Sequence, residues 1–97
     1  MRVRYKRAFA QFVKKASRPL QLQIEIKVLE VCANPWLGKQ KLGDLQNIYV
    51  YKFRFHAQEY LMAYQFDYAK TEKRLIWIDL HQIGPHENFY RQLKRTL

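Results

Sequence analysis

Histidine and glutamate side chains in the middle of the chain are the first candidates for chemistry. His56, Glu59 and Tyr60 stand close together between two runs that have the composition of β-strands. An imidazole and a carboxylate within reach of each other can act as a general acid–base pair near neutral pH. A polar hairpin turn with solvated side chains would have the same composition, so the local pattern leaves both interpretations open.

A further candidate histidine stands beside a turn near the C-terminal end. His86 follows Gly84-Pro85, and Tyr90 lies four residues after His86. Residues four apart share one face of a helix, so His86 and Tyr90 could face a substrate together if this segment is helical. The alternative is that His86 is an N-terminal helix residue without a chemical role.

Several cations could hold phosphate groups near these residues. Ile48, Val50, Lys52 and Arg54 are expected on one face of a strand, opposite Tyr49, Tyr51, Phe53 and Phe55. Lys52 and Arg54 would then display two cations side by side, where they could contact an RNA backbone or merely solvate the sheet edge. Lys39 and Lys41 lie in the preceding loop, and Arg74 directly precedes a later strand.

Other familiar catalytic patterns are missing from the sequence. It has no glycine-rich phosphate loop, no Cys-x-x-Cys pair and no His-Glu-x-x-His motif, and the histidines at 56, 81 and 86 lack the usual spacing of a zinc site. Cys32 is the single cysteine, and its place in an apolar periodic run predicts a small core residue. A reducing compartment, the cytoplasm, is therefore expected.

The charge distribution points to a polyanionic partner. The net charge is +10, and residues 1–19 contain seven cations and no acid. A solubilising face is the alternative. The length of 97 residues and an apolar content of 48% suit a single domain, residues 1–97, with a real core. The sequence has neither an apolar run of the roughly 18 residues that span a membrane nor the pattern of a signal peptide.

The elements that must position these residues follow from hydrophobic periodicity. A short strand is predicted at residues 3–5 and a helix over 8–16, where the apolar residues share one face. Residues 20–33 are ambiguous, because strict alternation over 21–28 favours a strand. Pro19 at the start and Asn34-Pro35 at the end favour a helix, which is the preferred interpretation.

The second half of the chain predicts an antiparallel meander. Strand-like runs cover residues 48–55, 60–68 and 75–80, Gly84-Pro85 breaks the chain, and residues 87–97 predict a closing helix. The order (β)ααβββα predicts an α+β fold, in which helices pack on one face of a small antiparallel sheet of three or four strands.

This order of elements resembles the RelE/ParE superfamily of type II toxin–antitoxin toxins over nearly the whole chain. The markers are Asn34-Pro35-x-Leu37-Gly38, Gly43-Asp44-Leu45, the Tyr-Leu-Met-Ala-Tyr run at 60–64 and the Leu-Ile-Trp-Ile run at 75–78. The resemblance also implies that residues 20–33 form a helix.

The closing segment is similar to the YafQ branch of that superfamily. Gly84, His86 and Tyr90 match a Gly-x-His-x-x-x-aromatic pattern whose histidine serves in RNA cleavage. The branch has a catalytic arginine where Gln82 stands. Lys52, Arg54 or Arg74 could supply that charge from another strand, or the activity could be weak.

The resemblance implies a toxin that enters the A site of the 70S ribosome and cuts mRNA, without a metal or small-molecule cofactor. His86 would act as acid or base, with Glu59 and His56 as its counterpart. Lys52 and Arg54 would stabilise the phosphorane-like state, and Tyr60 or Tyr90 would stack on a base. The partners would be an acidic antitoxin, mRNA and ribosomal RNA, the last of these contacted by the basic N-terminal helix.

Two other functions stay open at this point. A ParE-like inhibitor of DNA gyrase would cut no RNA and would be indifferent to substitution of His86. A non-enzymatic RNA- or ribosome-binding protein would bind RNA in a salt-sensitive manner without cleavage.

Overall fold

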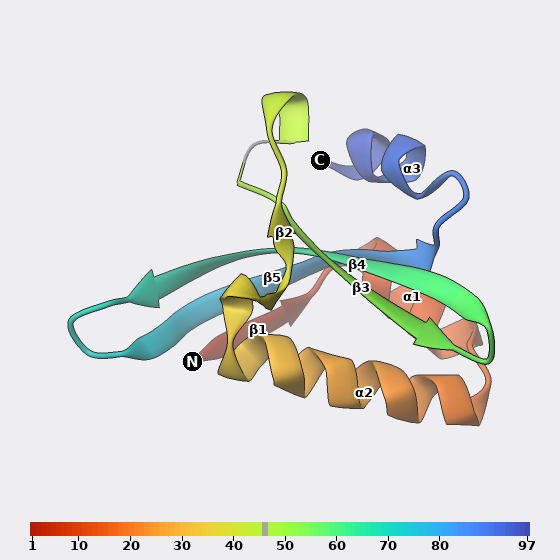
Figure 1. Cartoon of the computed structure of the whole chain (residues 1–97), viewed down its shortest axis with the longest axis horizontal. Coiled ribbons are helices and arrows are strands. Elements are labelled where there is room, and N and C mark those ends of the chain that lie inside the picture. Colours follow the sequence, from red (N-terminus) through yellow and green to blue (C-terminus); the bar gives the residue numbers. More distant parts are fainter. Residues whose placement is uncertain (46) are drawn as a thin grey trace.

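One mixed sheet of five strands forms the centre of the molecule. The computed structural model describes residues 1–45 and 47–97. Within them the spatial strand order is β1-β5-β4-β3-β2 (Figure 1). The bounds are β1 (Arg2–Tyr5), β2 (Lys39–Gln40), β3 (Tyr49–Phe55), β4 (Gln58–Ala69) and β5 (Arg74–Pro85).

The sheet corrects the prediction of a purely antiparallel sheet with three or four strands. β3, β4 and β5 form the expected antiparallel meander. β1 pairs in parallel with β5, and the two-residue strand β2 adds to β3 at the other edge. Both additions depend on contacts that local periodicity does not encode, because β1 joins the last strand of the chain and β2 is too short to show alternation.

The three predicted helices are confirmed with small shifts at their ends. They are α1 (Arg7–Lys15), α2 (Arg18–Ala33) and α3 (Phe89–Thr96). The backbone N–H of Leu20 donates to the side chain of Ser17 at 3.3 Å, which caps α2, and Pro19 occupies its first turn. The buried residues of α2 recur at helical spacing: Leu20, Ile24, Val28 and Val31. The ambiguous segment is therefore a helix.

The helices cover both faces of the sheet, whereas the sequence predicted one covered face. Figure 1 shows α2 below the strands and α3 above them. Phe9 of α1 and the buried face of α2 pack with Phe53, Met62 and Ile78. Phe89 and Leu93 of α3 pack on the other side. The reason is that β3 and β4 carry apolar residues on both faces, so each face needs a cover.

The hairpin turn between β3 and β4 and the length of β5 also differ from the sequence prediction. His56 and Ala57 have φ angles of 51° and 64°, so they form a two-residue hairpin turn between β3 and β4. β5 continues to Pro85, five residues beyond its predicted end at 80. A register shift beside Ala63 and Tyr64 leaves His81 as an extra residue on β5. β5 ends at Pro85, which pairs with Tyr60, so His86 follows directly beside the first residues of β4.

Two remaining features of the chain agree with expectation. Cys32 is half-buried against the core on the α2 side, where burial raises the pKa of its thiol. None of the helices in the described chain combines the length and apolarity required to cross a membrane.

Candidate functional site

A pocket of about 440 Å³ on the α3 side of the sheet collects half of the predicted site residues. Its apolar floor includes Val50 and Leu61, which belong to the core cluster beneath α3. Its lining includes five predicted site residues, namely Lys39, Lys41, Lys52, His86 and Tyr90. The pocket therefore combines three lysines, an imidazole and a phenol. That set can bind a phosphate group and move a proton.

Backbone pairing places the first two lysines. Lys39 in β2 pairs with Val50 of β3, and the N–H of Lys41 donates to the carbonyl of Ile48 at 2.8 Å. The Lys41 ammonium lies 5.3 Å from the centroid of the Tyr90 ring, within range of a cation–π interaction. Segments that are far apart in the sequence thus meet across the mouth of the pocket.

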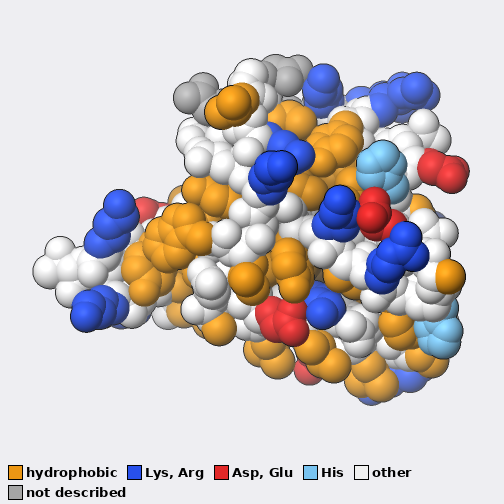
Figure 2. All heavy atoms as spheres, viewed as in Figure 1, with side chains coloured by type: hydrophobic (Ala, Val, Ile, Leu, Met, Phe, Trp, Pro, Cys, Tyr) orange, Lys and Arg blue, Asp and Glu red, His pale blue; other side chains and the backbone are white. Residues whose placement is uncertain are grey.

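The register of β3 and β4 brings further predicted residues to the pocket margin. Lys52 pairs with Leu61 and Arg54 pairs with Glu59, on the face that also carries Val50. Tyr60 pairs with Pro85, so Glu59 and His86 are the next residues along neighbouring chain segments. Figure 2 shows basic side chains around a histidine over β3, β4 and the start of α3, with an acidic side chain among them.

Three predicted site residues do not join this pocket. His56 lies at the tip of the hairpin, where its ring centroid is 4.2 Å from that of Phe55. Tyr60 faces the other side of the sheet and stacks on Phe53, with ring centroids 5.6 Å apart. Arg74 lies at the opposite hairpin and pairs with Glu72 at 2.8 Å. The described structure therefore does not unite His56 with His86 and gives Arg74 no route to the pocket.

Gln82, where the resemblance to the YafQ branch led us to expect an arginine, is buried beneath α3. Its side-chain amide donates to the carbonyl of Phe89 at 2.9 Å, and it does not line the pocket. Its Oε1 is buried and has no donor within the described chain. The positive charge in the pocket comes instead from Lys39, Lys41 and Lys52.

Tyr64 supports the site and was missed by sequence reasoning. Its buried hydroxyl donates to the carbonyl of Pro35 at 2.6 Å and accepts from the N–H of Gly38 at 2.9 Å. Burial raises the pKa of Tyr64 to about 12. A Cβ atom at Gly38 would lie 2.5 Å from the Tyr64 hydroxyl oxygen, so only glycine fits this contact. The hydroxyl thereby holds the turn before Lys39, and Gly38 in the marker segment was the available signal.

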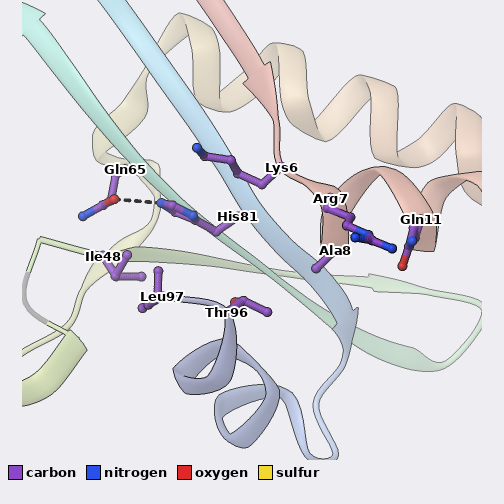
Figure 3. Close-up of a pocket in the computed structure, with 9 residues that line it drawn as sticks. All are labelled: Lys6, Arg7, Ala8, Gln11, Ile48, Gln65, His81, Thr96 and Leu97. Atoms are coloured by element: carbon purple, nitrogen blue, oxygen red, sulfur yellow. Dashed lines mark hydrogen bonds between the residues drawn. The ribbon is translucent and has the colours of Figure 1, made fainter.

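A larger cavity of about 840 Å³ lies elsewhere, beside the C-terminal end of α3 (Figure 3). Its lining includes His81, Gln65 and Lys6, for which the sequence suggested no role. His81 Nε2 and Gln65 Oε1 are 2.7 Å apart, and burial lowers the pKa of His81. The imidazole of His81 is engaged by Gln65, whereas the pocket of His86 places three lysines and Tyr90 around its histidine, so we place the candidate catalytic site there.

The fold and the comparisons together define the class of protein. The molecule is a small α+β protein with the element order expected of RelE/ParE toxins. Residues 3–94 match the profile of a family described as the ParE-like toxin of type II bacterial toxin–antitoxin systems. The chain belongs to this family, and it is a type II toxin of the RelE/ParE kind.

Solved structures of the E. coli toxin RelE share the fold. A double arginine-to-alanine mutant of RelE in the free state is 21% identical, with 99% of this chain and 97% of that chain covered and a TM-score of 0.68. The isolated RelE toxin is 20% identical, with 99% of this chain and 98% of that chain covered and a TM-score of 0.61. A chain of the intact E. coli RelBE toxin–antitoxin complex is 17% identical, with 89% of this chain and 96% of that chain covered and a TM-score of 0.59. No curated protein sequence matches the chain significantly.

Proposed function

We propose that this toxin is a metal-independent endoribonuclease that cuts mRNA in the ribosomal A site and so inhibits translation. The observation that carries the proposal is the pocket that unites His86 and Tyr90 with three lysines on an accessible face. The similarity of the fold to RelE supports it. A ribosomal target would place the protein in the cytoplasm.

The proposed reaction uses the RNA as its own nucleophile. The 2′-oxygen attacks the adjacent phosphorus, and the bond between phosphorus and the 5′-oxygen breaks. One protein group accepts the proton of the 2′-hydroxyl, and another donates a proton to the departing 5′-oxygen. We assign these proton transfers to His86 and Glu59. His86 follows Pro85 and Glu59 precedes Tyr60, and Pro85 and Tyr60 are paired in the antiparallel register of β4 and β5.

The remaining side chains of the pocket stabilise charge and position the RNA. Lys39, Lys41 and Lys52 are placed to surround a phosphate group whose negative charge grows during the attack. Arg54, which pairs with Glu59 across the strands, would add to the positive charge that stabilises the phosphate. Tyr90 offers a ring for stacking on a base, with the Lys41 ammonium already beside it. The ribosome would supply much of the substrate positioning.

The test compares two histidines in a translation-coupled mRNA cleavage assay. We expect His86→Ala to slow cleavage about 10²–10⁴-fold, the usual contribution of a general acid or base. His56→Ala is the matched control, because this histidine lies at the hairpin tip outside the pocket lining. Equal cleavage by wild type and His86→Ala would remove His86 from the mechanism.

Inhibition of DNA gyrase is the second candidate, because the matching family is described as ParE-like. It predicts gyrase-dependent DNA breaks, no mRNA cleavage and full toxicity of His86→Ala. RNA binding without cleavage would instead identify a non-enzymatic RNA- or ribosome-binding protein.

We also propose that an acidic antitoxin neutralises this protein. The structural neighbour RelBE is a toxin–antitoxin complex, and a net charge of +10 favours a partner of opposite sign. Co-expression with the product of an adjacent small reading frame should restore growth if that product is the antitoxin.

A further inference from the structure

We propose that the groove between α1 and α3 is a second RNA-binding surface, separate from the candidate cleavage pocket, that holds a single-stranded RNA segment. The proposal deepens the proposed function and rests on it only in taking RNA as the target. We call this surface the α1–α3 groove. Its walls are the two helices, and its floor is the last part of β5.

Two adjoining cavities make up the groove. The cavity of about 840 Å³ is lined by Lys6, Arg7 and His81, among others, and a second cavity of about 690 Å³ by Lys15, Gln82 and Arg95, among others. Both are also lined by Ala8, Gln11 and Thr96, so the two spaces adjoin. Figure 3 shows the first of them, with residues of the β1–α1 junction on one side of β5 and Thr96 and Leu97 on the other.

The groove is separate from the pocket of His86. The two cavities share no lining residue with that pocket. α3 contributes to both places with different residues: Tyr90 lines the pocket, whereas Gln92, Arg95 and Thr96 line the groove. A ligand in the groove would therefore leave the candidate cleavage pocket open.

The charge of the groove favours a polyanion. Its lining includes Lys6, Arg7, Lys15 and Arg95 but no aspartate or glutamate among the described residues. The carboxylate of Asp79 lies 3.9 Å from Lys6, and it already accepts two hydrogen bonds of 2.7 Å from Arg4. Arg7, Lys15 and Arg95 have no ion-pair partner within residues 1–45 and 47–97. Three cations therefore remain available for a ligand.

The uncharged lining offers contacts for the bases and riboses of an RNA segment. Gln11 and Gln92 offer amide donors and acceptors, which suit base edges as well as phosphates. The half-buried ring of Phe12 adds an apolar contact for a base.

The test measures binding without cleavage. The probe is a fluorescent single-stranded RNA of about twelve nucleotides whose ribose 2′-oxygens are methylated, so the nucleophile of the proposed reaction is absent. The dissociation constant is measured by fluorescence anisotropy at several salt concentrations, for the full-length wild type and two double variants. Circular dichroism confirms that each variant is folded.

The two double variants are matched in charge and in helix. Lys15→Ala/Arg95→Ala removes one groove cation from α1 and one from α3. Lys14→Ala/Arg91→Ala removes one cation from each of the same helices outside the groove lining. Each phosphate contact adds about 0.7 to the salt slope for a single strand. The groove variant loses two such contacts. We therefore expect the slope of the logarithm of the association constant against the logarithm of the salt concentration to fall in magnitude by about 1.4. The control variant should keep the wild-type slope.

Three outcomes would overturn the proposal. Equal weakening in both double variants would mean general attraction to a basic protein, and an unchanged groove variant would mean that the groove does not contact RNA. If a poly-glutamate peptide displaces the probe as effectively as unlabelled RNA does, the ligand of the groove is an acidic protein and not RNA. If wild type cleaves no mRNA but binding depends on the groove, the proposed enzymatic function fails while this inference stands.

Discussion

The buried hydroxyl of Tyr64 shows how one side chain can organise a distant site. It connects the centre of β4 to the turn before Lys39, through hydrogen bonds to Pro35 and Gly38. Lys39 and Lys41 of the candidate pocket follow directly after this turn. Their position therefore depends on a residue that never reaches the pocket itself.

Tyr64→Phe should destabilise the protein by about 1–3 kcal/mol, because it leaves a buried carbonyl and a buried N–H without their partner. Urea denaturation measures this difference. Tyr68→Phe is the control, since the Tyr68 hydroxyl makes no hydrogen bond within the described structure, and its effect should stay within about 0.5 kcal/mol. An equal effect of both substitutions would show that the Tyr64 hydrogen bonds do not hold the turn.

At the scale of the secondary-structure elements, the short helix α3 supports part of the candidate site. It has eight residues, too few for an isolated helix to be stable in water, and it is attached through Phe89 and Leu93. Tyr90 of this helix lines the candidate pocket, and His86 lies in the short segment between β5 and α3. The docking of α3 therefore sets the geometry of both groups.

Leu93→Ala should cost about 2–5 kcal/mol, because the side chain is fully buried and its loss leaves a cavity under α3. Cleavage should fall at temperatures where the rest of the protein remains folded, because α3 detaches first. Thermal unfolding and the mRNA cleavage assay, run in parallel, measure the two effects. Normal cleavage by a destabilised Leu93→Ala protein would show that α3 does not position the site.

At the scale of the whole molecule, the ion pair of Arg4 with Asp79 links the first strand of the chain to the last. The Asp79 carboxylate on β5 is 8% exposed and accepts from Arg4 of β1, which holds the parallel edge strand in place. The hydrogen bond from Arg4 holds the pKa of Asp79 below its usual value of 3.8. A depressed carboxyl pKa stabilises the folded state above the unfolded pKa, and this contribution is lost as the pH falls below it.

Asp79→Asn should therefore lower the melting temperature at pH 7, where the native carboxylate is charged and paired. The difference from wild type should shrink as the pH falls from about 5 towards 2, because protonation removes the same interaction from the wild type. Thermal melts across this pH range measure it. A difference that is independent of pH would mean that Asp79 contributes by packing and not by charge.

The charge of the molecule is divided among surfaces with different proposed tasks. Three lysines line the candidate cleavage pocket, and four cations line the α1–α3 groove on the other side of α3. The sequence showed the N-terminal excess of charge, but it did not show that cations of α1 would face Arg95 of α3 across a cavity. That arrangement depends on where the two helices dock.

The sequence alone determined most of the element order and part of the site. Ser17, Pro19 and Asn34 mark the ends of α2, and alternation in β3 correctly separated Lys52 and Arg54 from the aromatic face. Alternation along β4 also sends Glu59 and Tyr60 to opposite faces, a consequence that the sequence interpretation did not draw. These features are local, since a cap or a period of two or 3.6 residues is encoded within a few positions.

Only the tertiary structure decided which distant residues meet. The parallel pairing of β1 with β5, the docking of α3 on the second face and the extra residue His81 on β5 all depend on contacts between distant segments. Together they bring His86 beside Lys52, bury Gln82 under α3 and leave His56 at the hairpin tip. The physical reason is that register and layer order minimise the free energy of the whole core, which no short window of sequence contains.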